Sequence, residues 1–247
     1  CRPSSGRKME ALYRTGAPFD WYLIDDLDAI RDKGYKVFVF LDCFYLTADQ
    51  LRAVESLRSQ NRTLVWFYAP GYASQEDLSV ARMEALTGFA FEPVAEGTLQ
   101  GTLNATGEAV GIAKRQKSLC VVRGGEGVCG LAHGVDKLKE KTVMALKRHP
   151  GWTSVFSAIP GVTADQLRTL YREAGVHIYC DSGDVLSANE AWLMLHTRAA
   201  GKRHVTLPKA CKIITEITTE KIVAENANAF SIDRPKHSTA VFLLEGK

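Results

Sequence analysis

The sequence predicts an α/β domain over residues 1–190, with an open, mostly parallel sheet and flanking helices, followed by a small antiparallel β domain over residues 191–247. The main observation is a set of three apolar runs in the first third of the chain, at residues 19–24, 37–41 and 63–68. Polar residues hardly interrupt these runs, which is typical of strands buried on both faces of a parallel sheet.

Two helix start signals are the second observation. Thr47 and Gln50 precede an apolar stripe with helical spacing, and so do Thr163 and Gln166. In such a capping box the hydroxyl accepts a backbone hydrogen bond while the glutamine reaches back to the start of the helix. The first signal lies between two apolar runs and predicts a βαβ unit, and a strand over residues 176–180 is expected directly after the second helix.

The middle of the chain carries weaker patterns. It predicts a helix over residues 79–86, glycine-rich turns over residues 97–111 and 124–134, and a strand over residues 119–122. Beyond residue 189 the sequence changes to short β runs at residues 192–195, 205–207, 213–217 and 240–244. Without helical periodicity, these runs predict a small antiparallel layer next to the α/β domain.

Composition narrows the possible partners. With 46% hydrophobic residues, the 247-residue chain can bury a sizeable core. The net charge is only +3 and the basic residues are dispersed, so nucleic acid is not expected as a partner. No run approaches the roughly 20 apolar residues that a membrane span needs.

The chain begins with Cys1 and enters an ordered-looking segment about ten residues later, which predicts a fragment or a processed product of a longer protein. The alternative is a mature lipoprotein with lipid on Cys1. The six cysteines form no C-x-x-C pair, so we predict buried thiols rather than a disulfide framework or a metal site. The glycine-rich segments lack the lysine of a phosphate loop, and no cofactor is expected.

Polar and aromatic residues follow the predicted strands. In open α/β sheets the ligand crevice lies at the carboxyl ends of the strands, where we expect Asp25, Asp42, Tyr72 and Asp181. Carboxylates accept hydrogen bonds from sugar hydroxyls, and aromatic rings pack against the C–H face of a sugar. These four residues are therefore candidate carbohydrate-binding residues, and the alternative is ordinary turn and capping chemistry.

The residues at the same strand ends could instead have a catalytic role. A pair drawn from Asp25, Asp42 and Asp181 could hydrolyse a glycoside, although nothing in the sequence selects the pair. Cys43 follows a strand, where an amidotransferase places its nucleophile, but Phe44 and Tyr45 are too bulky for a strained elbow. We therefore assign no catalytic residue and expect Cys43 to be unreactive.

Several segments together resemble a known family. They are Tyr22 to Leu27, Val37 to Cys43, Trp66 to Tyr72, Gly151 to Ser157, Leu167 to Tyr179 and Gly183 to Asn189. They resemble the class I glutamine amidotransferase-like domain called the β-galactosidase trimerisation domain, which follows a catalytic barrel in bacterial glycoside hydrolases. The resemblance covers about residues 17 to 208, and the tail resembles the short β domain that follows in that family.

The resemblance implies a flavodoxin-like or amidotransferase-like sheet, subunit contacts that make a homo-oligomer, and a place on the rim of a sugar pocket. It also implies a catalytic barrel domain in the parent protein, which this chain lacks, because a single clear βα repeat stands where eight are needed. The sequence thus predicts a non-catalytic accessory or assembly module. The alternatives are a stand-alone hydrolase or amidotransferase using Cys43 or the strand-end carboxylates, and a free sugar-binding module.

Overall fold

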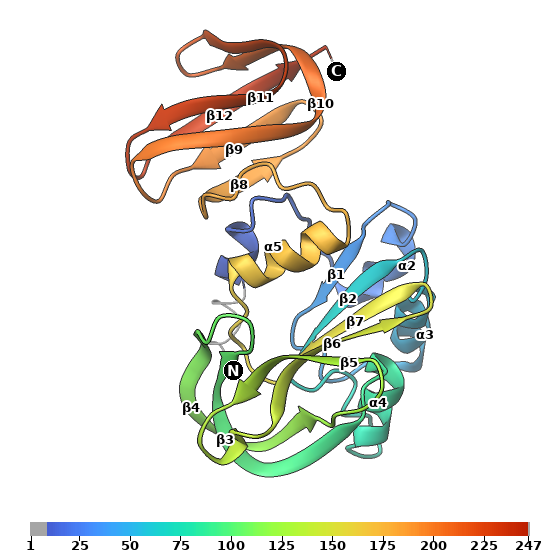
Figure 1. Cartoon of the computed structure of the whole chain (residues 1–247). Coiled ribbons are helices and arrows are strands. Elements are labelled where there is room, and N and C mark those ends of the chain that lie inside the picture. The colour runs from blue at the N-terminus through green and yellow to red at the C-terminus, as the bar shows by residue number, and fades with distance from the viewer. Residues whose placement is uncertain (1–8, 247) are drawn as a thin grey trace. The chain divides into compact units, whose positions relative to one another are not determined.

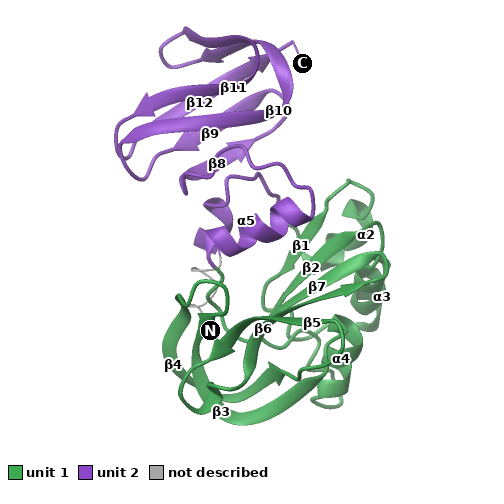
Figure 2. Cartoon of the chain, viewed as in Figure 1, with its two compact units in different colours: residues 1–8, 22–162 green, residues 9–21, 163–247 purple. Residues whose placement is uncertain are grey.

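The computed structural model describes residues 9–246, which form two compact units (Figures 1 and 2). Unit 1 contains Tyr22–Val162, and unit 2 contains Met9–Trp21 together with residues 163–246. Cys1, for which a lipid-bearing role was the alternative prediction, lies outside the described residues. The predicted domain division after residue 190 stays a prediction.

Unit 1 is built on a seven-stranded sheet with the strand order β1-β2-β7-β6-β4-β3-β5. The strands are β1 (Val37–Phe40), β2 (Arg62–Phe67), β3 (Phe91–Leu103), β4 (Ala109–Val122), β5 (Val128–Gly134), β6 (Thr142–His149) and β7 (Trp152–Ser157). The helices are η1 (Ile24–Asp26), α2 (Leu27–Ile30), α3 (Ala48–Ser56), α4 (Val80–Thr87) and η2 (Asp136–Leu138).

The parallel part of this sheet is small. It consists of β1 paired with β2 and β2 paired with β7, which lie side by side in Figure 1. The strands predicted from the apolar runs at residues 37–41 and 63–68 are confirmed as β1 and β2. The helix between them is confirmed as α3, where Thr47 Oγ1 accepts a hydrogen bond from Gln50 N at 3.2 Å. The helix predicted at residues 79–86 is confirmed as α4.

The prediction of an open, mostly parallel, flavodoxin-like or amidotransferase-like sheet is wrong. All other ladders between the described strands are antiparallel, and the longest of them in unit 1 joins β3 to β4. Strand β6 pairs with β5 as well as with β4, and β3 pairs with both β4 and β5, so these four strands close on themselves. The sheet is therefore mostly antiparallel.

The turns predicted at residues 97–111 and 124–134 are confirmed only at residues 104–108 and 124–127, and glycines within the strands explain why the remaining residues were assigned wrongly. Gly97 lies in β3 and Gly134 in β5, where both face Leu138. A Cβ on Gly97 would lie 2.4 Å from Leu138 Cδ1, and a Cβ on Gly134 would lie 2.4 Å from Leu138 Cβ. Glycine within a strand often marks such a close approach. The missing side chains make room for Leu138, which is 2% exposed.

Trp66 on β2 joins the parallel strands to α4. Its ring stacks on Phe40 of β1, with ring centroids 4.4 Å apart and an interplanar angle of 11°. Its Nε1 donates a hydrogen bond to Ser154 Oγ of β7 at 3.1 Å, and Ser154 Oγ donates to the Thr87 carbonyl at the end of α4 at 2.6 Å. All polar atoms in this chain of contacts are thereby paired inside the core, which avoids the cost of burying them unsatisfied.

Unit 2 contains a helical segment at residues 9–13, the helix α5 and a five-stranded antiparallel sheet with the order β11-β10-β12-β9-β8. Its elements are α5 (Ala164–Glu173), β8 (Val185–Ala188), β9 (Trp192–His196), β10 (Gly201–Glu216), β11 (Lys221–Arg234) and β12 (Thr239–Glu245). The helix after Thr163 and an antiparallel sheet late in the chain are confirmed. The run at residues 205–207 and all but the last residue of the run at residues 213–217 belong to one long strand, β10, and β11 was not predicted.

Two predicted strands are absent from the described structure. Residues 176–180 form no strand, although Tyr179 N donates to the Gly16 carbonyl at 2.8 Å and its side chain packs in the core of unit 2. Residues 19–24 form no strand either, and Trp21 is 47% exposed. In both segments the apolar pattern reflects side-chain packing or aromatic clustering rather than a β ladder.

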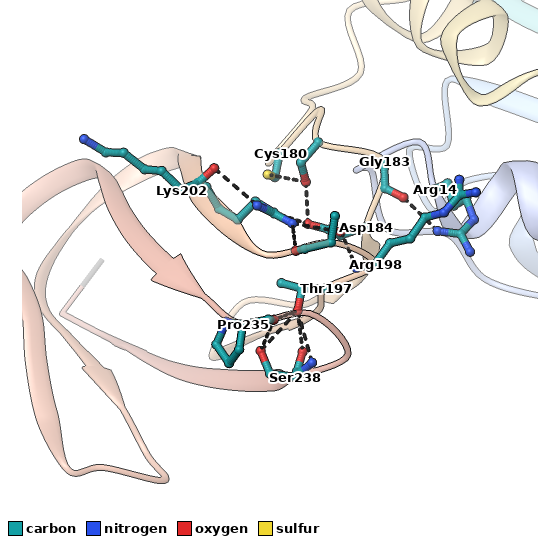
Figure 3. A network of polar contacts seen from close by, with 12 residues as sticks. Arg14, Cys180, Gly183, Asp184, Thr197, Arg198, Lys202, Pro235 and Ser238 are labelled. Carbon is teal, nitrogen blue, oxygen red and sulfur yellow. Dashed lines mark hydrogen bonds and ion pairs between the residues drawn. The ribbon is translucent and has the colours of Figure 1, made fainter.

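A buried carboxylate organises the polar core of unit 2 (Figure 3). Asp184 Oδ1 accepts a hydrogen bond from Arg198 N at 2.7 Å, and Oδ2 accepts from Ser182 Oγ at 2.7 Å and from Arg203 Nε. Burial alone would raise the pKa of Asp184, but these hydrogen bonds and the charge of Arg203 outweigh burial and lower the pKa. The carboxylate is therefore charged and paired at neutral pH.

We predict that Gly134→Ala destabilises unit 1 by about 1–3 kcal/mol, because the new Cβ overlaps Leu138 and overpacked cores must shift. The urea midpoint of unfolding measures this loss. Gly125→Ala is the matched control, since nothing lies within 4 Å of a Cβ at Gly125. Equal midpoints for the two variants would show that the close approach to Leu138 does not constrain the fold.

We predict that Asp184→Asn lowers the free energy of unfolding of unit 2 by about 3–5 kcal/mol, because Arg203 is left as a buried charge without its partner. Asp181→Asn, which breaks the exposed pair with Arg172, should cost only about 0–1 kcal/mol. Urea unfolding followed by the amide signals of β9 and β10 measures both.

The lowered pKa sets the pH dependence of the Asp184 contribution. The contribution is fully present above the ordinary aspartate pKa of about 4, and it is lost as the pH falls from there through the pKa in the folded protein. The difference between wild type and Asp184→Asn should therefore shrink in acid. A difference that grows on acidification would contradict this assignment.

Candidate functional site

The candidate site lies in unit 1 at the carboxyl ends of β1 and β2. The loops that follow these strands are joined by backbone hydrogen bonds, from Gly71 N to the Cys43 carbonyl at 2.8 Å and from Ala73 N to the Phe44 carbonyl at 3.0 Å. Tyr45 and Ala73 form a parallel β bridge. The two loops are thus held together beyond the ends of the strands themselves.

Three aromatic rings meet on these loops, and we call Phe44, Tyr68 and Tyr72 the edge aromatic cluster. Phe44 stacks on Tyr68 with ring centroids 5.9 Å apart at 14°, and it meets Tyr72 edge-on at 5.8 Å and 70°. Phe44 is 39% exposed, while both tyrosines are half-buried. Aromatic pairs in such geometries attract each other beyond simple burial, so the exposed faces are held in fixed positions.

Tyr68 is fixed most firmly of the three. Its hydroxyl donates a hydrogen bond to the Ser118 carbonyl at 3.2 Å and accepts one from Gln116 Nε2 at 3.4 Å. Burial raises the pKa of Tyr68 more than the Gln116 hydrogen bond lowers it, so the phenol is neutral at physiological pH. Its backbone φ of 64° lies in the left-handed region, a costly conformation that persists where surrounding contacts enforce it.

Arg82 on α4 holds the loop that carries Tyr72. Its guanidinium donates to the carbonyls of Gly71 at 3.4 Å, Tyr72 at 3.1 Å and Asp77 at 2.9 Å. It also pairs with Asp77 Oδ1 at 2.7 Å. The hydrogen bond from Arg82, followed by one from Ser74, lowers the pKa of Asp77. One side chain thus satisfies three carbonyls of a loop that has little regular structure.

Two of the four predicted site residues lie on these loops. Tyr72 belongs to the edge aromatic cluster. Asp42 lies on the loop after β1, ahead of Phe44, and has a left-handed φ of 54° and an exposed side chain. Asp25 lies in η1, and its Oδ1 accepts a hydrogen bond from Gln50 Nε2 at 2.6 Å. Asp181 belongs to unit 2 and pairs with Arg172 at 3.2 Å. Their role in carbohydrate binding stays a prediction.

Sequence reasoning missed Tyr68 and Gln116 as parts of this site. Tyr68 continues the apolar run of β2, and the sequence predicts it as the last residue of that strand, but β2 ends at Phe67. Gln116 lies in β4, which the sequence pattern did not predict over its full length. Nothing in the sequence around Gln116 indicates that it lies near Tyr68. Only the folding of β4 back toward the end of β2 creates this contact.

Metal ligands, a reactive thiol and membrane spans are the other features to consider in the described residues. Between residues 9 and 246, no three His, Cys, Asp or Glu side chains gather as they would around a metal ion. Cys43 is a half-buried thiol whose Sγ donates weakly to the Leu41 carbonyl at 3.8 Å. None of the helices in the described part of the chain is long and apolar enough to span a membrane.

Comparison with known proteins gives a clear result for the fold. No protein-family model matches the chain, and no curated protein matches its sequence. Solved structures do match it. The chain shares its fold with part of several β-galactosidases.

The β-galactosidase of Bacillus circulans sp. alkalophilus matches with a TM-score of 0.67 and 16% sequence identity, over 98% of this chain and 37% of that one. A GH42 β-galactosidase of G. stearothermophilus matches with a TM-score of 0.68 and 12% identity, over 98% and 36%. The enzyme of Rahnella sp. R3 matches with a TM-score of 0.64 and 14% identity, over 98% and 36%. The chain thus spans just over a third of the length of these β-galactosidases.

We predict that Arg82→Ala speeds amide hydrogen exchange in residues 72–78 by on the order of tenfold, because the loop loses its hydrogen bonds to the guanidinium. Mass-spectrometric hydrogen exchange under native conditions measures the effect. Arg52→Ala is the control, since Arg52 pairs only with exposed Asp49 on α3. Unchanged exchange in Arg82→Ala would show that other contacts hold the loop.

Proposed function

We propose that this chain is a non-catalytic accessory and assembly module of a β-galactosidase-like glycoside hydrolase. We further propose that its edge aromatic cluster forms part of a carbohydrate-binding surface. The observation that carries the second part is the fixed, partly exposed group of three rings where β1 and β2 end. The shared fold with part of several β-galactosidases supports the first part.

The edge aromatic cluster suits a saccharide for two reasons. The rings of Phe44 and Tyr72 present apolar area against which the C–H face of a sugar can pack. The exposed carboxylate of Asp42, on the same loop as Phe44, can accept hydrogen bonds from sugar hydroxyls. Because the support from Arg82, Gln116 and Ser118 already fixes the loops, binding would cost little additional ordering.

The contacts of the carboxylates favour binding over catalysis. Asp25 is engaged by Gln50 within unit 1, and Asp181 is engaged by Arg172 within unit 2. A glycosidase instead needs two carboxyl groups that face one scissile bond. Cys43 is followed directly by Phe44, whose ring is part of the aromatic cluster, so the thiol lacks the small neighbours of a nucleophile elbow.

The assembly part of the proposal concerns the whole protein. We propose that a catalytic barrel domain accompanies this chain in its parent protein, and that the module contributes to a homo-oligomer in the manner of a trimerisation domain. The match of the chain to just over a third of each β-galactosidase supports a module of a larger protein. Sedimentation of the parent protein with and without residues 9–246 tests the assembly role directly.

We predict that Tyr72→Ala weakens the binding of galactosides by on the order of 1 kcal/mol or more, because the sugar loses part of its stacking area. Calorimetric titration with lactose and galactose-containing oligosaccharides measures this loss. Trp192→Ala is the control, since Trp192 is an exposed aromatic residue of unit 2. Its affinity should equal that of wild type.

Two results would count against the proposed function. The absence of heat with every saccharide, or equal affinity for wild type and Tyr72→Ala, would remove the sugar-binding part. Release of galactose from a chromogenic galactoside by the isolated chain would contradict the non-catalytic part. In that case Asp42→Asn and Cys43→Ala would show which of the two residues carries the reaction.

A further inference from the structure

A second polar site lies in unit 1, apart from the edge aromatic cluster. It is an open pocket of about 320 Å³ lined by Asn104, His133, Lys139 and Glu140. Asn104 stands in the turn between β3 and β4, His133 lies on β5, and the other two residues follow η2. The volume is within the range of small-molecule sites, which begins at about 300 Å³.

Asn104 and His133 hold each other in one orientation. Asn104 Nδ2 donates a hydrogen bond to the Gly130 carbonyl at 2.9 Å, which fixes the amide so that Oδ1 faces His133 Nδ1, also at 2.9 Å. Since Oδ1 can only accept, Nδ1 must carry the proton. In the neutral imidazole, Nε2 is then a hydrogen-bond acceptor.

The segment that carries Lys139 and Glu140 is also fixed. We call residues 135–141 the η2 strap. Its Leu138 side chain is buried, and Gly134 N donates to the Lys141 carbonyl at 2.9 Å. Lys141 Nζ contacts both carboxylate oxygens of Glu92 on β3 at 2.8 Å.

Two more contacts anchor the η2 strap to β3. Thr98 Oγ1 donates a hydrogen bond to Asp136 Oδ2 at 2.9 Å, and Lys137 pairs with Glu96. The strap's other polar residues are thus used for anchoring, and Lys139 and Glu140 are the two that line the pocket. The strap is therefore anchored on both sides of Lys139 and Glu140, whose side chains are exposed.

The lining groups define the chemistry of a ligand. Lys139 offers hydrogen-bond donors, Glu140 offers acceptors, and His133 Nε2 offers one more acceptor. The opposite charges of Lys139 and Glu140 balance, which disfavours both simple anions and simple cations. A neutral compound with several hydroxyl groups can donate and accept at each position around its ring.

We propose that this pocket is a second binding site for a neutral saccharide. The site goes beyond the edge aromatic cluster of the proposed function and shares no residue with it. Because the lining residues include no Phe, Tyr or Trp, the sugar would bind mainly through hydrogen bonds. Each such bond contributes modestly in water, so the affinity is in the millimolar range, at about 1 kcal/mol per hydrogen bond.

The test is a titration of the ¹⁵N- and ¹³C-labelled protein with lactose, monitored by NMR. The ring signals of His133 should shift, and the ¹⁵N spectrum of the neutral imidazole should show the proton on Nδ1. Glu140→Gln, which replaces a charged acceptor with a weaker neutral one, and Lys139→Met, which removes the donors, should each weaken the His133 response about fivefold. Glu126→Gln is the control, since Glu126 is exposed in the turn before β5 and does not line the pocket.

The same titration separates this site from the edge aromatic cluster. In Tyr72→Ala the His133 response to lactose should be unchanged, whatever happens to the signals of Phe44 and Tyr68. No shift of His133 at 100 mM lactose, on the order of 100 times a millimolar dissociation constant, would overturn the proposal. Equal His133 responses in Glu140→Gln and Glu126→Gln would also overturn it. The same holds if His133 responds to zwitterionic glycine but not to lactose.

Discussion

The structure of unit 1 depends on the buried contacts of Trp66. Its ring stacks on Phe40, and its indole N–H binds Ser154, so one side chain fixes the register of β2 against a strand on each side. Phe40 is opposite Trp66 in the β1–β2 ladder, and Trp66 is opposite Phe156 in the β2–β7 ladder. A shift by one residue would turn Trp66 to the other face and break both contacts. This parallel register brings the loops after β1 and β2 to the same edge.

The edge aromatic cluster is the consequence of that register. Asp42 and Tyr68 have left-handed backbone conformations, each of which costs about 1–3 kcal/mol in a residue other than glycine. Cross-loop hydrogen bonds, the Arg82 guanidinium and the Ser118 carbonyl offset this cost. A loop that is supported so fully and yet leaves aromatic area exposed supports the proposed binding role.

Local signals in the sequence predicted local structure well. Capping boxes at Thr47 and Thr163 marked the starts of α3 and α5, and continuous apolar runs marked β1 and β2. The overall sheet could not be predicted in this way. Gly97 and Gly134 look like turn residues in the sequence, and only the position of Leu138 against them shows why strands carry glycine there.

The candidate site was predictable in part for the same reason. The rule that ligands bind beyond the carboxyl ends of parallel strands pointed to Asp42 and Tyr72, and both lie on the loops after β1 and β2. It failed for Asp25, because the apolar run before it is not a strand. Gln116 could not be found, since its contact with Tyr68 joins residues 48 positions apart through an unrecognised strand.

We propose above all that the edge aromatic cluster binds a saccharide. A crystal structure of the chain grown with a saturating galactoside tests it most directly, because it locates the sugar without relying on a variant. We expect a sugar ring with its C–H face against Phe44 or Tyr72 and a hydroxyl within hydrogen-bond distance of Asp42. An unoccupied edge, or sugar found only in the pocket at the η2 strap, would contradict the claim.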